Sequence, residues 1–239
     1  MQLSTLMQEL SLLRHESSFN YTLSQMGIYG VWEDIERNNP SGNLPYHNNP
    51  HMKYVARVGY ELYCLANLVR GSFVIEEAIA VILAGLVHDV HHSGGEFLDD
   101  TDNVARALDF LAGLRTRHTY IADRIWDDVH QLVHSTRYPH DNTNTFHELQ
   151  GYVRDADFMY SLEIYSLTPI MHGIPRELTH KIGKLLTPSQ FVNPQQEFMD
   201  QALFYTHPGI HIWSHCKDKA FELEQNYALG TVQSVKTLP

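Results

Sequence analysis

The sequence of 239 residues predicts an all-α fold, with a single helical domain over residues 1–239. Two observations favour this class, and composition indicates a globular protein. Apolar residues recur at intervals of three and four wherever a period is visible, which is the spacing of one helix face. No segment shows the alternation of a half-buried strand. A content of 43% hydrophobic and 19% charged residues is typical of a globular protein with a packed core.

Three predicted helices and a final one follow from this spacing. Their apolar positions are Leu3, Leu6, Met7, Leu10 and Leu13, then Val104, Leu108, Leu111 and Leu114, then Ile121, Ile125, Val129 and Leu132. Thr101 and Asp102 are candidate caps of the helix that contains Val104. The polar stretch "KDKAFELEQ" predicts the last helix, followed by a loose tail.

Two further helices carry the segments with chemical interest. Pro50 suits the first position of a helix, with Asn49 as its cap. The segment "AIAVILAGLVHDVHHSGG", residues 78–95, is apolar nearly all round before its histidines, which predicts a central buried helix closed by Gly94 and Gly95. Loops are expected at "NNPSGNLP", "RYPHDNTNTFH" and "HGIP", where proline and glycine cluster.

Composition excludes several classes of function. A net charge of −11 without a cluster of Lys and Arg argues against polymeric nucleic acid as a partner. The longest apolar run, Ala78–Val87, is too short to cross a bilayer, and the chain does not open on a secretory signal pattern. We therefore expect a cytoplasmic protein without membrane association. Cys64 and Cys216 form no CxxC pair and are expected to be buried thiols.

The end of the predicted central helix gathers metal-binding side chains. At about 100° per residue, His88, Asp89 and His92 fall within an arc of about 100°, whereas His91 points outside it. Histidines favoured by the helix dipole are the simpler explanation, but that explanation leaves the aspartate unaccounted for. Imidazole with carboxylate suits zinc, manganese, iron or magnesium rather than calcium.

Two other regions offer partners for this group. His51 would lie in the first turn of its helix and suits a ligand, while His47 on the preceding loop could hand a proton to a leaving group. Further along, Asp157 shares a helix face with Leu149, Val153 and Tyr160 and is expected to point inward. Asp155 lies about 160° away and is expected to be solvated.

The order His51, His88-Asp89, Asp157 resembles the pattern H, HD, D of the HD-domain metal-dependent phosphohydrolase superfamily. Within it, "YHNNPH" and "HDVHHSGG" are similar to the YHNxxH and HDxxH motifs of cyclic nucleotide phosphodiesterases. The resemblance covers about residues 45–160 and implies an HD-domain helical bundle, with residues 161–239 as a C-terminal helical extension.

The resemblance implies a division of roles. His51, His88, Asp89 and Asp157 would hold one of two divalent ions, and Asp89 would also bridge to the second. His47 would be the proton donor and His92 would support the water shell of the second ion, so that His47, His92 and Asp89 form the catalytic group. Thr136, in "HSTRYPH", would touch the same shell.

The chain also departs from the family pattern. Where the family has a glutamate near the second ion, "DDTDNVARAL" offers Asn103 or Asp102, and His134 and His140 are alternative contributors or plain loop residues. The family closes its base pocket with a glutamine and a phenylalanine. The candidates here, among which the sequence does not choose, are Gln190, Phe191, Gln195, Gln196 and Phe198.

The predicted function is hydrolysis of a nucleotide phosphodiester, most specifically a 3′,5′-cyclic one, by a metal-bridging hydroxide, with a small nucleotide as substrate. The alternative is an HD-type nucleotidase or phosphatase that cleaves a phosphomonoester or a triphosphate. A non-catalytic binding protein and a diiron oxygenase are more distant possibilities. Arg137, Lys53 and Arg57 are candidates to steer phosphate, although each is also explained as a surface cation. The sequence leaves the native metal and the oligomeric state open.

Overall fold

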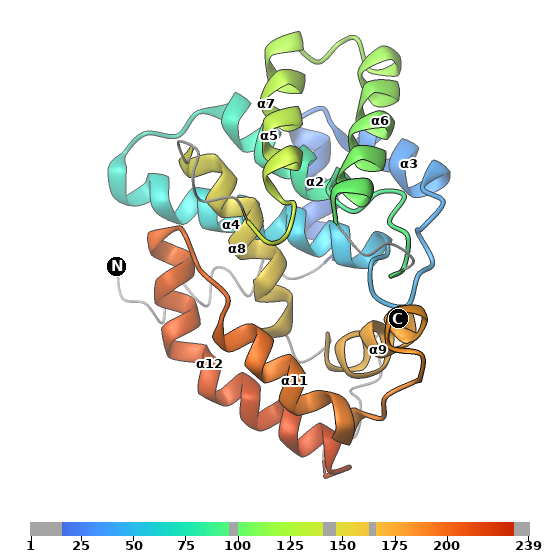
Figure 1. Ribbon diagram of the computed structural model, residues 1–239. Helices are drawn as coiled ribbons and strands as arrows, with labels where there is room; N and C mark the ends of the chain where they lie inside the picture. The colour runs from blue at the N-terminus through green and yellow to red at the C-terminus, as the bar shows by residue number, and fades with distance from the viewer. Residues whose placement is uncertain (1–15, 96–99, 141–146, 163–165, 232–239) are drawn as a thin grey trace.

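The computed structural model describes residues 16–95, 100–140, 147–162 and 166–231, and all regular secondary structure among them is helical, with no strand (Figure 1). The prediction of an all-α fold is confirmed. The α-helices are α2 (Glu16–Gln25), α3 (Tyr29–Asn38), α4 (Asn49–Arg70), α5 (Ile75–Val87), α6 (Thr101–Arg117), α7 (Asp123–Ser135), α8 (Glu148–Met159), α9 (Ile174–Glu177), α10 (Thr179–Ile182), α11 (Pro188–Asp200) and α12 (His207–Ala228). A 3-10 turn, η1 (Tyr160–Leu162), follows α8, and a π-helical turn, η3 (Pro169–Gly173), precedes α9.

Helix α5 is the centre of the main core. Its side chains from Ala80 to Val87 are all buried, and it packs against α4, α7 and α8. Gly85 allows the closest approach, because a Cβ placed there would lie 2.5 Å from the Cα of Ala56 on α4. The predicted central helix is therefore confirmed, and it fixes the position of the His88-Asp89 pair at its end.

Several predicted helix ends are wrong by one or more residues. The cap of α4 is Asn48, whose Oδ1 accepts the His51 N–H at 3.0 Å, while the Asn49 side chain bonds instead to Asn39. Helix α5 ends at Val87, well before Gly94, because the chain turns at once and His91 adopts a left-handed φ of 65°.

Helix α6 begins at Thr101, earlier than a cap at Thr101 or Asp102 would place it. Its cap position is Asp100, and neither Thr101 nor Asp102 occupies it; within the described part of the chain, no side chain caps this end by a hydrogen bond. The apolar positions Val104, Leu108, Leu111 and Leu114 lie on α6, and Ile125, Val129 and Leu132 lie on α7, while Ile121 precedes α7. The first predicted helix, Leu3 to Leu13, and the tail after residue 231 lie outside the described residues.

The extension after residue 161 contains more helix than the sequence predicts. The segment "HGIP", expected as a loop, closes η3 and opens α9, and Pro175 lies in the first turn of α9, where a missing N–H is tolerated. The final helix starts at His207, well before the predicted "KDKAFELEQ". Ile170, Met171, Phe191 and Val192 form a small second core between η3 and α11.

Asp155 corrects a prediction and joins the extension to the main core. It was expected to be solvated, yet its side chain is fully buried. Its carboxylate accepts the backbone N–H groups of Tyr205 and Thr206, each at 2.8 Å, and the Thr206 hydroxyl at 2.6 Å. The face of α8 opposite Asp157 is therefore covered by the start of α12, which helical phase alone does not reveal.

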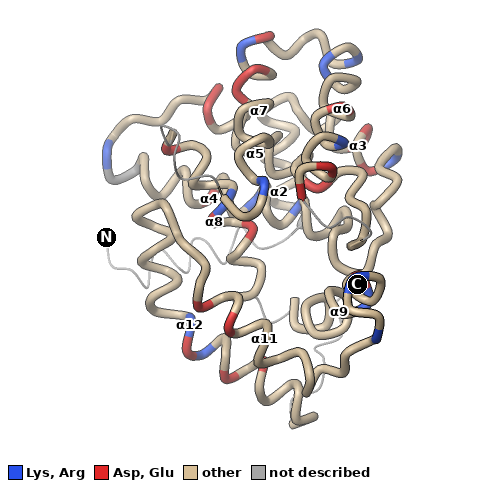
Figure 2. Tube along the Cα trace, in the orientation of Figure 1, with Lys and Arg blue, Asp and Glu red and all other residues tan. Residues whose placement is uncertain are grey.

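The two cysteines and the charged residues complete the description of the fold. Cys64 and Cys216 are free and partly exposed, rather than buried as predicted. Figure 2 shows Lys and Arg scattered over the elements and mixed with Asp and Glu. Over the ranges that the structure describes, no helix combines the length and apolarity that a membrane crossing requires.

Candidate metal centre and its cavity

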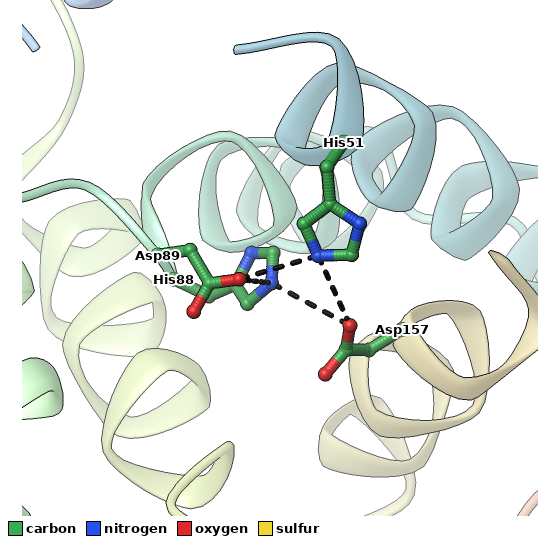
Figure 3. Close-up of side chains that lie close together, drawn as sticks. All are labelled: His51, His88, Asp89 and Asp157. Carbon is green, nitrogen blue, oxygen red and sulfur yellow. Dashed lines mark ion pairs between the residues drawn. The ribbon is translucent and has the colours of Figure 1, made fainter. Parts of the chain in front are cut away.

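His51, His88, Asp89 and Asp157, which are far apart in sequence, converge at one point (Figure 3). Asp89 Oδ2 lies 3.2 Å from His51 Nε2 and 3.0 Å from His88 Nε2. Asp157 Oδ1 lies 3.2 Å from His51 Nε2 and 3.9 Å from His88 Nε2. The four predicted metal ligands are therefore brought together, and Asp157 points toward the cluster while 36% of its side chain remains exposed.

Local structure aims each of these side chains. His51 stands in the first turn of α4, next to the Asn48 cap, and is fully buried. His88 follows α5 directly, and its Nδ1 lies 2.9 Å from the carbonyl oxygen of Gly85. Donation from Nδ1–H to that carbonyl leaves the Nε2 lone pair free, which is the usual arrangement of a metal-binding histidine.

The geometry fits a bound cation. Nε2 of His51 and Nε2 of His88 are buried, and among the described residues neither has a hydrogen-bond partner, although carboxylate oxygens lie nearby. Ligand atoms at about 2.1 Å from one ion lie roughly 3.0 to 3.5 Å apart in octahedral or tetrahedral arrangements. Most distances in the cluster fall in this range. Two imidazole nitrogens and two carboxylates could thus hold a divalent metal ion.

The charge state of the carboxylates suits the same role. Burial alone would raise the pKa of Asp89, but His88, His47 and His51 outweigh burial and lower it well below its usual range. Burial likewise acts to raise the pKa of Asp157, and the neighbouring imidazoles of His51 and His88 lower it instead. Both groups are therefore ionised at neutral pH, as ligands must be.

A second group of side chains lies beside the cluster. His47 Nδ1 is 2.5 Å from Glu177 Oε2, and Glu177 Oε1 accepts the backbone N–H groups of Tyr46 at 2.6 Å and His47 at 3.1 Å. The His47 ring stacks on His92, with centroids 3.7 Å apart and an interplanar angle of 26°. Burial acts to lower the pKa of His47, but Asp89 and Glu177 together raise it, so His47 is disposed to carry a proton.

His47, His92 and Glu177 are close enough to share a cation, but the stacking argues against it. Imidazole lone pairs lie in the ring plane, and nearly parallel rings direct them side by side rather than toward one point. The short contact between His47 and Glu177 is a charge-assisted hydrogen bond. The group is therefore a hydrogen-bonded pair of His47 and Glu177 with the His92 ring stacked on His47.

Glu177 was missed by the sequence analysis. It lies in α9, inside the "HGIPRE" stretch expected as a loop, and it is buried. Its partner His47 is 130 residues away. The local pattern holds no signal for such a contact, because a lone glutamate in a short helix reads as solvent-exposed.

One cavity of about 1020 Å³ connects both groups. Of the residues that the resemblance named, His47, His88, Asp89, His92, Asn103, Thr136, Arg137, His140, Asp157, Phe191, Gln195 and Phe198 line it. Part of the cavity wall is aromatic, since Phe198 lies 5.4 Å from Tyr138 and 5.8 Å from Phe158 between ring centroids. The cavity thus combines polar and aromatic lining residues.

The other named candidates lie elsewhere. His134 is exposed on α7. Lys53 packs over the Trp32 ring, and Arg57 pairs with Glu61. Gln190 takes part in the capping box of α11, where its Oε1 accepts the Thr187 N–H. Gln196 donates to the carbonyl oxygen of Phe221 on α12. The structure therefore reduces the glutamine and phenylalanine candidates to Phe191, Gln195 and Phe198.

Fold and site together define the chain as an all-helical protein with a cluster of two histidines and two aspartates that could hold a metal ion. No family model matches the sequence, and no curated protein matches it significantly.

Proposed function

We propose that the protein is a metal-dependent phosphohydrolase that cleaves a nucleotide phosphodiester, most specifically a 3′,5′-cyclic nucleotide. The observation that carries the proposal is the pairing of two unlike devices in one cavity. Two histidines and two aspartates form the ligand cluster, and among the described residues the Nε2 atoms of these histidines have no hydrogen-bond partner. Next to the cluster lies His47, whose Nδ1 is hydrogen-bonded to the buried Glu177.

The residues divide the work of hydrolysis. His51, His88, Asp89 and Asp157 would hold the divalent cation, and Asp89 would reach a second one. When bound, such cations lower the pKa of water and neutralise charge on a phosphate group. Glu177 fixes Nδ1 of His47, which leaves Nε2 to protonate the leaving oxygen. The aromatic wall offers a planar base a surface on which to stack.

The side chains around the cavity carry charges of both signs. Four lining side chains are acids, namely Asp89, Asp100, Asp157 and Glu177. Within the described residues, Arg137 and Lys181 are the lining side chains with a permanent positive charge. Two divalent cations on the ligand cluster would more than offset its two carboxylates, so the charge of the cavity does not separate a diester from a polyphosphate. We prefer the phosphodiesterase over the nucleotidase alternative because the sequence carries HDxxH together with the YHNxxH histidine, His47.

The test combines metal analysis with product identification. Protein loaded with Mn²⁺ is expected to open cyclic nucleotides to nucleoside monophosphates and to leave monophosphates and triphosphates intact. Asp157→Asn should lose bound metal, because it removes a charged ligand, whereas His47→Ala should retain metal and lose about 10²- to 10⁴-fold in kcat. His130→Ala, an exposed histidine on α7, is the matched control and should match the wild type.

Each competing function gives a different result. Release of inorganic phosphate from nucleotides would show that the protein is a phosphatase rather than a phosphodiesterase. Oxygen uptake by an iron-loaded sample would indicate an oxygenase. Metal binding without turnover of any substrate would point to a non-catalytic protein, and wild-type rates in His47→Ala would exclude His47 as the acid.

A further inference from the structure

Asn103 links the turn after α5 to the start of α6 through three contacts. Its side chain is only 8% exposed. Oδ1 accepts the Ser93 N–H at 3.0 Å, while Nδ2 lies 2.9 Å from His92 Nε2 and donates to Asp100 Oδ1 at 3.2 Å. The amide side chain thus contacts both the backbone and the ring of the turn that carries His92, and it donates to Nε2 when the ring proton of His92 is on Nδ1.

Asp100 holds this amide in turn. Its Oδ2 accepts the backbone N–H of Tyr138 at 2.9 Å, so one carboxylate joins Asn103 to the segment that forms the aromatic wall. The other side of the His92 turn is fixed as well, because Ser41 Oγ accepts the His92 N–H at 3.1 Å. His92 is therefore restrained in both its backbone and its ring.

The restrained ring is the one on which His47 stacks. The two centroids are 3.7 Å apart, which is van der Waals contact, so the His92 plane limits the tilt of His47. Glu177 fixes only one edge of His47, through Nδ1. The hydrogen bond to Glu177 fixes the direction of Nδ1, and the stacked His92 ring limits the tilt of the His47 ring plane.

We propose that Asn103, held by Asp100, is a positioning residue that fixes the His92 ring against His47 and so aims the proton donor at the leaving oxygen. The expected change in rate rests on the proposed function, whereas the restraint of the His92 ring by Asn103 does not. Misplacement of a catalytic group by about 1 Å can cost about 10²-fold in rate. The loss should appear only where a proton is needed.

Two substrates with different leaving groups distinguish a positioning role of Asn103 from a merely structural one. The alkoxide leaving group of a 3′,5′-cyclic nucleotide requires protonation, whereas the 4-nitrophenolate of bis(4-nitrophenyl) phosphate departs without it. Asn103→Ala is expected to lower kcat for the cyclic nucleotide about 10- to 100-fold and kcat for the nitrophenyl ester less than about 3-fold. Bound metal should remain unchanged, and Asn103→Ser should recover part of the rate.

Asn67→Ala is the matched control. Asn67 is another asparagine that is 8% exposed, and it bonds within α4 to the Tyr63 carbonyl. It should cost comparable stability and leave the ratio of the two rates unaltered. Equal losses on both substrates in Asn103→Ala would overturn the proposal. If Asn103→Ala does not fold, Asp100→Asn provides the same comparison, with a smaller change in the ratio of the two rates.

A second readout does not need turnover. Stacking on His92 shifts the carbon-bound ring protons of His47 in the NMR spectrum, and these shifts should move toward their unstacked values in Asn103→Ala but not in Asn67→Ala. An unchanged shift would overturn the proposal. Wild-type protein that cleaves neither substrate would refute the proposed function, while the NMR comparison would still decide the role of Asn103.

Discussion

Replacing Glu224 by glutamine is expected to stabilise the protein at pH 8 by about 3 kcal/mol and to change its stability at pH 5 by less than about 1 kcal/mol. Glu224 lies on α12 and is fully buried. Its Oε2 accepts from Gln196 Nε2 at 3.3 Å, while Oε1 has no hydrogen-bond partner among the described residues. Burial raises the pKa of Glu224 from 4.5 to about 7, and the bond from Gln196 opposes burial only in part.

The sign and size follow from proton linkage. Because the folded carboxyl holds its proton more tightly than the unfolded one, folding takes up a proton between about pH 4.5 and pH 7. The free energy of unfolding of the wild type therefore falls as the pH rises through this window. Each pH unit is worth about 1.4 kcal/mol, which gives about 3 kcal/mol once Glu224 is ionised. Glutamine keeps the shape and removes the charge.

Urea unfolding at pH 5, 6, 7 and 8 measures the difference between the two proteins. Glu222→Gln is the matched control, because Glu222 is exposed on the same helix, and its substitution should have little effect at any pH. A Glu224→Gln difference that is the same at pH 5 and pH 8 would refute the reasoning, since it would show that Glu224 is not kept protonated by burial.

Two substitutions test the packing that positions the site. Asp155→Asn should destabilise the fold by about 2 to 4 kcal/mol in urea unfolding, because its NH₂ group would face one of the donors on Tyr205 and Thr206 that the carboxylate now satisfies; an effect below about 1 kcal/mol would contradict this. Gly85→Ala should lower stability by about 3 kcal/mol or more, measured as a fall in Tm, since its Cβ would meet the backbone of Ala56 at 2.5 Å. An unchanged Tm would mean that α4 and α5 can separate without cost.

The ligand cluster was predictable because each part carries a local signal. His88 and Asp89 interrupt an apolar run, and Asp157 interrupts an apolar helix face, so both positions call for an explanation in the sequence itself. The same reasoning failed at Asp155, since the face opposite the core was assumed to meet water. In the structure Thr206 and Tyr205, which lie about fifty residues later, cover that face.

Helix ends were less predictable than helices. Asn48 and Asn49 are equally good caps by composition, and only the hydrogen bond to His51 N distinguishes them. The early end of α5 depends on the left-handed backbone of His91, a conformation that asparagine or glycine would have signalled and histidine does not. The role of Glu177 was not predictable, because its partner His47 comes close only in the folded chain.

Asp155 and Asp157 point in opposite directions from a short stretch of α8, one toward the base of α12 and the other toward the metal ligands. The start of α12 and the ligand cluster are therefore anchored to the same short segment of α8, so the docking of α12 and the placement of Asp157 depend on one piece of backbone.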